Sequence, residues 1–201
     1  MPPTFLYPIL PYRSFFLPFL VVTAIAVPCW LVFRLYHHRT VAHRVSFHRE
    51  LLLLIFVVYL SGLATATLTP SHGSRAAIEA TGGFDLRPSV GSLTCASSSL
   101  PSGSTAHAFC MRNARGNVVL FFPLGILLPL VFRRLRFWRV LQIATALSMS
   151  IEVVQYLSMA WINRTADVND VILNGFGACL GLICVSLLRL RRGTWSVVSR
   201  A

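Results

Sequence analysis

The chain has no lysine and little acid: eighteen arginines stand against six Asp or Glu residues among 201. Charged residues make up only 12% of the sequence, whereas about 25% is usual in soluble domains. Hydrophobic residues reach 55%, and several apolar runs approach the roughly 20 residues that cross a bilayer as a helix. The composition excludes an ordinary soluble domain and predicts an all-α, polytopic transmembrane helix bundle.

The five cysteines and six histidines form no metal-binding pattern, and we expect no metal and no cofactor. Cys29, Cys179 and Cys184 lie in apolar runs and are typical of small core residues. Cys95 and Cys110 share one hydrophilic loop. If that loop lies outside the cell, a disulfide closing about 15 residues would contribute roughly 3 kcal/mol. Two unpaired thiols are the alternative.

Five hydrophobic spans are expected, and the region around them is basic. The expected spans are 15–36, 51–68, 117–132, 140–161 and 170–188. The expected organisation is an N-terminal span and basic linker (1–50), a transmembrane domain (51–188) with a long loop at 70–116 and a short helix near 76–80, and a basic tail (189–201).

The arginines predict the orientation of the chain. With five spans, the linker 34–50, the turn 133–139 and the tail from 189 fall on one side, and they hold twelve of the eighteen arginines. Arginine-rich loops remain cytoplasmic, so the N-terminus and the 70–116 and 161–169 loops are expected outside and the C-terminus inside. Arginines at span ends favour contact with membrane lipid over nucleic acid.

Half of the acidic residues fall between positions 152 and 170. Glu152 lies thirteen residues beyond Arg139, about 20 Å along a helix axis, and therefore inside the outer half of the bilayer. A carboxylate there is costly and is tolerated mainly where it meets a partner or a ligand. A polar stripe at helical spacing accompanies it: Thr145, Ser148, Glu152, Gln155 and Met159.

The fifth span begins with its own polar face. Asp170, Asn174, Gly177 and Gly181 share one side, and the two glycines form a G-x-x-x-G element that lets another helix approach closely. We expect that face to pack against the fourth span. The residues expected to converge near the outer face and bind a ligand are Asn117, Glu152, Gln155, Arg164, Asp167, Asp170 and Asn174.

Plainer roles compete with ligand binding for several of these residues. Asp167 and Asn117 can be helix N-caps, and Arg164 can pair with a nearby acid. Glu152 and Gln155 are mid-helix, so for them the alternatives are structural bonding between helices and a ligand pocket, of which we favour the pocket. The pair Pro123 and Gly125 can be a kink and a packing contact.

Three segments in this order resemble the VanZ-like membrane family: NVVLFFPLG at 117–125, SIEVVQ at 150–155 and RTADVNDVILNGFG at 164–177. The resemblance covers roughly 51–188 and implies a bacterial integral membrane protein of four or five helices. The namesake of that family is associated with low-level resistance to the glycopeptide teicoplanin. The long, serine-rich loop with two cysteines and the basic first linker depart from the family pattern.

Three classes of function follow. The first is a non-enzymatic protein of the bacterial envelope that binds a lipid-linked, cell-wall-related or lipoglycopeptide ligand, with a link to antibiotic resistance. The second is an intramembrane enzyme using Glu152 with Asp167 or Asp170 as acid and base; the sequence contains no H-E-x-x-H and no nucleophile elbow. A small transporter ranks third, since five spans without an inverted repeat would need oligomerisation. The oligomeric state stays open.

Overall fold

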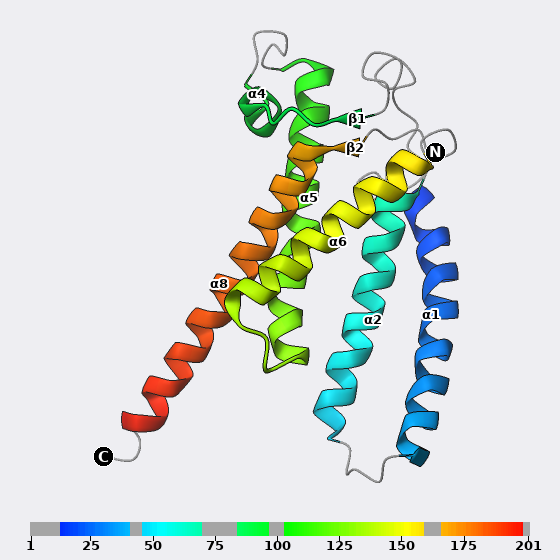
Figure 1. Ribbon diagram of the computed structural model, residues 1–201, viewed down its shortest axis with the longest axis vertical. Helices are drawn as coiled ribbons and strands as arrows, with labels where there is room; N and C mark the ends of the chain where they lie inside the picture. The colour runs from blue at the N-terminus through cyan, green and yellow to red at the C-terminus, as the bar shows by residue number, and fades with distance from the viewer. Residues whose placement is uncertain (1–12, 41–45, 70–83, 97–102, 159–165, 199–201) are drawn as a thin grey trace, which may run out of the picture. The chain divides into compact units, whose positions relative to one another are not determined.

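The computed structural model describes residues 13–40, 46–69, 84–96, 103–158 and 166–198 (Figure 1). It divides into two compact units, 1–71 and 72–201. The expected all-α membrane fold is confirmed, because five helices in the described part of the chain are long and apolar enough to cross a membrane. The helix expected at 76–80 lies outside the described residues, as do Met159 and Arg164.

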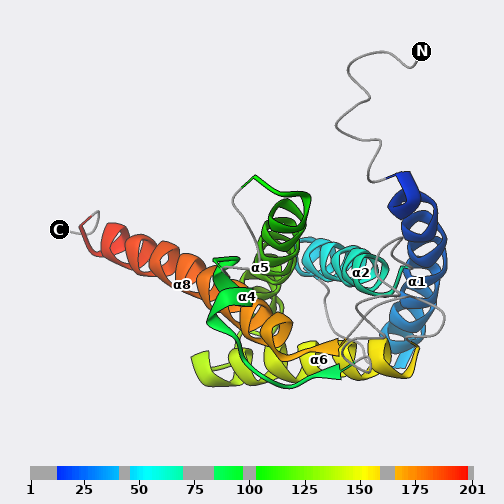
Figure 2. The ribbon, with the colours of Figure 1, turned by 90° about the horizontal axis from the view of Figure 1, so that it is seen from above.

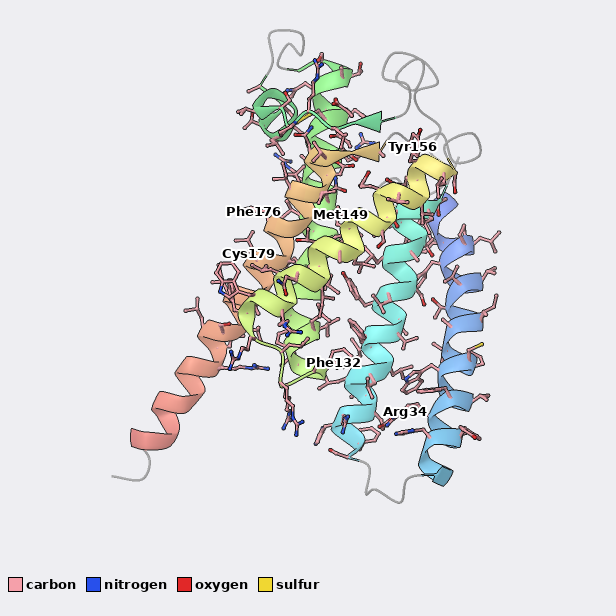
Figure 3. The ribbon with its side chains drawn as sticks, in the orientation of Figure 1. Arg34, Phe132, Met149, Tyr156, Phe176 and Cys179 are labelled. Carbon is pink, nitrogen blue, oxygen red and sulfur yellow. A yellow bond between two sulfur atoms is a disulfide. The ribbon has the colours of Figure 1, made fainter. Side chains whose placement is uncertain are left out.

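The first unit is a pair of helices, α1 (Arg13–Thr40) and α2 (Phe47–Leu68). They pack closely enough that a Cβ added to Gly62 of α2 would lie 3.5 Å from the ring of Phe19. Arg34 and Glu50 form an ion pair between them, with Nε donating to Oε2 at 2.9 Å (Figure 3). Both helices therefore extend into the segment expected to be a basic linker.

Three buried hydroxyls in α2 are satisfied by the backbone of their own helix. Ser61 donates to the carbonyl of Val57 at 3.0 Å, Thr65 to that of Ser61 at 2.8 Å and Thr67 to that of Leu63 at 2.9 Å. Such back-bonding lets hydroxyls sit inside a membrane-length helix without an unpaired donor. These residues need no ligand to explain them.

The second unit contains α5 (Thr105–Val131), α6 (Phe137–Leu157) and α8 (Val168–Val198). Figure 1 shows α5 and α8 running in the same direction with α6 oblique to them, and Figure 2 shows α6 on one side of the pair. The core is small and apolar, with five hydrophobic side chains of these helices at most 1% exposed: Phe121, Leu124, Val140, Ala144 and Ala178.

Glycines bring the backbones of α5 and α8 into direct contact. A Cβ added to Gly177 would lie 2.3 Å from the carbonyl oxygen of Val118, and one added to Gly181 would lie 2.0 Å from that of Phe122. The two glycines therefore pack against α5, and the expectation that their face packs against the fourth span is wrong for Gly177 and Gly181. The fourth span, α6, also contacts α8, and a hydrogen bond between Ser148 of α6 and Asn174 of the same face of α8 joins them.

Helix α5 begins at Thr105, twelve residues before the expected start of the third span. Ser104 caps it, because its hydroxyl accepts the backbone N–H of His107 at 3.1 Å. The first three turns carry Arg112, Asn113 and Arg115, which lower the hydropathy of a segment that is nevertheless helical. The expectation of one loop from 70 to 116 is therefore wrong at its C-terminal end.

A small cap covers the N-terminal ends of α5 and α8. Strands β1 (Phe84–Asp85) and β2 (Ala166–Asp167) pair in parallel, and the short helix α4 (Val90–Thr94) follows β1. Cys95, directly after α4, is joined by a disulfide to Cys110 of α5. Of the two alternatives for Cys95 and Cys110, the structure has the disulfide and not two unpaired thiols.

We expect the disulfide to stabilise this cap. The Cys95→Ser, Cys110→Ser double variant should lose about 3 kcal/mol of unfolding free energy, because a cross-link of this length restricts the unfolded chain. Chemical unfolding in mixed micelles measures the loss, with Cys184→Ser, an exposed free cysteine, as control. Maleimide labelling of five thiols in the non-reduced, unfolded protein would contradict the pairing, since three are expected.

Candidate functional site: a buried polar cluster on α6 and α8

The carboxylate of Glu152 is buried and binds the backbone where β2 meets α8. Its side chain is 7% exposed. Oε2 accepts the backbone N–H of Asp167 at 2.9 Å. Glu152 therefore points into the unit and toward the last helix, rather than toward lipid. A charge-assisted hydrogen bond of this kind compensates part of the cost of burying a carboxylate.

A second polar contact joins α6 and α8 one turn away. Nδ2 of Asn174 donates to Oγ of Ser148 at 2.8 Å, and the two side chains are 3% and 0% exposed. Ser148 and Glu152 are four residues apart and so share one face of α6. The polar stripe expected on the fourth span is therefore the surface that meets α8 at these two positions.

Helix α5 contributes two asparagines to the same region. Asn113 donates from Nδ2 to Oδ1 of Asp170 at 3.1 Å. Asn117 follows Asn113 by four residues on α5, and Asn174 follows Asp170 by four residues on α8. Val118, the residue after Asn117, lies against Gly177. Because the two helices run in the same direction, Asn117 and Asn174 lie at one level of the α5–α8 contact.

Two buried amide atoms in this region are left unsatisfied. Nδ2 of Asn117 and Oδ1 of Asn174 are buried, and neither has a hydrogen-bond partner among the residues that the structure describes. One is a donor and the other an acceptor. An unpaired buried polar group costs about 1–3 kcal/mol, and such groups in native proteins call for an explanation.

Asp167 acts as a cap on α8. Its Oδ1 accepts both the backbone N–H of Asn169 at 2.8 Å and the side-chain Nδ2 of the same residue at 2.7 Å. Asn169 in turn accepts the backbone N–H of Ser89 through its Oδ1 at 3.0 Å. The geometry of Asp167 is therefore that of a helix N-cap, one of its two predicted roles. The same chain of hydrogen bonds connects the cap formed by β1 and α4 to Glu152.

The outcome differs among the remaining residues of the expected site and the polar stripe. Gln155 is buried on α6, with 4% of its side chain exposed. Asn117 lies twelve residues inside α5, so the alternative that it caps the third span is wrong. Thr145, on the expected stripe, is exposed. Arg164 belongs to a segment outside the described residues, so its pairing stays a prediction.

Two contributors, buried Asn169 and exposed Asn113, were absent from the expected site. Asn169 is 2% exposed and connects Asp167 to the cap. Asn113 holds Asp170. The four-residue spacing of Asn113 and Asn117 would have indicated a polar face on α5, had the helix been extended back to Thr105. Within the described ranges, no group of three or more His, Cys, Asp or Glu residues could hold a metal ion.

We expect the bond between Ser148 and Asn174 to stabilise the contact of α6 with α8. Ser148→Ala should lower the free energy of unfolding by about 1 kcal/mol, since hydrogen bonds between membrane helices have modest net strength. Ser150→Ala is the matched control, because exposed Ser150 bonds only the carbonyl of Ala146 in its own helix as far as the structure describes. Equal stabilities of the two variants in mixed micelles would argue against the contact.

The fold and this cluster define a class of protein: a multi-pass α-helical membrane protein with an acid and several amides buried between helices. The VanZ/LLP1 family model matches residues 51–189, and the chain belongs to that family. The match begins within α2 and ends in α8, so it includes every residue of the polar cluster.

A relative agrees with this assignment. Over 71 residues the chain is 33% identical to Protein VanZ of Enterococcus faecium, a stretch that covers 35% of this chain and 42% of that protein. The chain therefore aligns with less than half of the length of this relative. No solved structure matches.

Proposed function

We propose that the protein is an envelope component that binds a lipid-linked, cell-wall-related or lipoglycopeptide ligand through the polar cluster. The observation that carries the proposal is the pair of unsatisfied amide atoms, Asn117 Nδ2 and Asn174 Oδ1, beside buried Glu152. A ligand with both hydrogen-bond donors and acceptors, such as a peptide or an acetamido sugar, would satisfy both atoms and recover their cost.

Each residue expected at the site from the sequence has a role in this proposal. Glu152 accepts hydrogen bonds or pairs with a cationic group of the ligand, while Gln155 and Asn174 orient it. Arg164 meets an anionic group such as a diphosphate, since a guanidinium binds such groups with two parallel hydrogen bonds. Asp167 and Asp170 hold the start of α8 in place.

The disulfide and the arginines support an outward orientation of the cluster. Disulfides persist in oxidising compartments, and Cys95–Cys110 lies in the cap at the end of the unit where α5 and α8 begin. Arg133, Arg134, Arg136 and Arg189 lie at the other end, which the positive-inside rule assigns to the cytoplasm. We therefore propose that the cluster faces the outer leaflet, with the C-terminus inside.

Acid–base catalysis is the alternative, and two contacts disfavour it. Oδ1 of Asp167 accepts two hydrogen bonds from Asn169, and Oδ1 of Asp170 accepts one from Asn113. The Asp167 carboxylate is thus engaged in capping α8, and the Asp170 carboxylate in a side-chain contact with α5. Binding requires no proton transfer by Asp167 or Asp170.

The proposal is tested by binding and by phenotype. Full-length protein in nanodiscs is titrated separately with an undecaprenyl-diphosphate-linked muropeptide precursor and with teicoplanin. Glu152→Gln should weaken binding by about tenfold or more, because hydrogen bonds to a charged group are worth about 1.5–3 kcal/mol. Thr145→Ala, exposed on the same helix, should bind as the unmodified protein does.

Expression in a teicoplanin-sensitive Gram-positive host provides the second readout. We expect the protein to raise the inhibitory concentration of teicoplanin and Glu152→Gln to remove that gain. Binding and phenotype that are both intact in a folded Glu152→Gln, Asn174→Ala variant would refute the proposed site. Turnover of the precursor that stops in Glu152→Gln would establish the catalytic alternative instead.

A further inference from the structure

Arginines from two helices gather at the end of the second unit that lies away from the cap. Arg133, Arg134 and Arg136 occupy the turn between α5 and α6, and Arg139 lies in the first turn of α6; all four are exposed. Arg189 of α8 joins them. Its Nη2 donates to the carbonyl of Pro129 at 2.8 Å, which fixes this part of α8 one helical turn from the arginine turn.

No described acid balances this charge. The described acids of the second unit are Asp85, Glu152, Asp167 and Asp170, and all belong to the cap or to the polar cluster. Arg189 is nineteen residues along α8 from Asp170, about 28 Å at 1.5 Å per residue. The ion pair found among described residues joins Arg34 to Glu50 in the first unit. The five arginines therefore form a positively charged group with no described acid beside it.

Aromatic side chains border the same turn. Phe132, Phe137 and Trp138 are 48%, 40% and 72% exposed, and Figure 3 shows Phe132 at the end of α5. The rings of Phe137 and Trp138 meet edge to face with centroids 5.3 Å apart. Exposed aromatics at the end of a membrane helix lie at headgroup level. The arginines beside them are thus placed where lipid phosphates are.

We propose that Arg133, Arg134, Arg136, Arg139 and Arg189 form a binding site for the phosphate of an anionic phospholipid. Guanidinium groups recognise phosphate by paired hydrogen bonds, and their weak hydration suits a partly dry interface. The aromatic side chains contact the glycerol and upper acyl region of the same lipid. This site is separate from the polar cluster and does not depend on the ligand proposed there.

The test compares phosphatidylglycerol with phosphatidylcholine on the full chain. Protein from nanodiscs with equal amounts of both lipids is transferred to neutral detergent, and retained lipids are counted by native mass spectrometry. We expect phosphatidylglycerol to be enriched about tenfold or more, since each arginine near an anionic surface contributes roughly a factor of five. The triple variant Arg133→Gln, Arg134→Gln, Arg136→Gln should lose the enrichment.

Arg112 and Arg115 provide the matched control, because they are exposed at the opposite end of α5. Their double Gln variant should keep the enrichment. If the triple variant does not fold, Arg136→Gln alone should lower the enrichment severalfold. Added salt should also lower the enrichment in the unmodified protein. Equal retention of both lipids, undiminished enrichment in a folded arginine variant, or displacement by 10 mM inorganic phosphate would each overturn the proposal.

Discussion

Gly181→Ala should lower the free energy of unfolding by about 3 kcal/mol or more, a large effect for the addition of one methyl group. The added Cβ would lie 2.0 Å from the carbonyl oxygen of Phe122, closer than any real contact allows. That oxygen belongs to the backbone of α5 and cannot rotate away, so the helices must separate. Overpacking of this kind typically costs 1–3 kcal/mol, and more where backbone must move.

Gly175→Ala is the control, because it makes the same change in the same helix with nothing within 4 Å of the new Cβ. Alanine is the better helix former by up to about 1 kcal/mol, so this variant should be as stable as the unmodified protein or slightly more so. Chemical unfolding of both variants in mixed micelles provides the comparison. Similar losses for the two would mean that α8 does not contact α5 through its glycines.

The second large effect is expected at Glu152. Glu152→Leu should cost about 2–3 kcal/mol, because the partly buried backbone N–H of Asp167 loses its acceptor and the start of α8 loses its bond to α6. Glu152→Gln keeps an oxygen at that position and should cost about 1 kcal/mol or less. The same micelle unfolding assay measures both, and the order of the two variants is the informative result.

Val153→Leu is the reference for Glu152→Leu, since Val153 is the neighbouring residue and is 54% exposed. It should leave stability unchanged within about 0.5 kcal/mol. If Glu152→Leu proved as stable as the unmodified protein, the carboxylate would have no structural partner. The pairing of Glu152 with β2 would then be untenable.

The helices were predictable because a span must be long and apolar, and that signal stands out in any sequence. The buried positions of Glu152 and Gln155 were predictable for a related reason: a polar residue in such a span must meet something. The ends of the helices were harder to predict from the sequence. The polar first turns of α5 carry no hydropathy signal, although the Ser104 cap and the disulfide at Cys110 hold them helical.

The choice of helix partners was beyond the sequence. A G-x-x-x-G face predicts that another helix packs closely against it, but it does not identify that helix. Gly181 approaches Phe122 closely because Gly125 of α5, which has no side chain, lies at the same level of the contact. The parallel pairing of β1 with β2 was also not visible, since two-residue strands have no periodicity. Those strands nevertheless set the position of Asp167 against Glu152.

The cap connects the disulfide to the candidate site. Ser89, just before α4, donates to Asn169, and Asn169 donates to Asp167, whose own N–H reaches Glu152. The double variant that removes the disulfide therefore also tests how far the cap stabilises the candidate site. We expect the loss of the cross-link to loosen the Glu152 region before it affects the helix contact at Gly181.

The most direct measurement follows the side-chain amides of Asn117 and Asn174 by nitrogen-15 NMR of the nanodisc-embedded protein during titration with the undecaprenyl-diphosphate-linked muropeptide precursor. Asn117→Ala and Asn174→Ala assign the two signals, and Asn113, which already bonds Asp170, is the internal reference. The proposed function predicts saturable shifts at Asn117 and Asn174 that Glu152→Gln weakens about tenfold. Saturable binding that leaves both amide signals unmoved would contradict it.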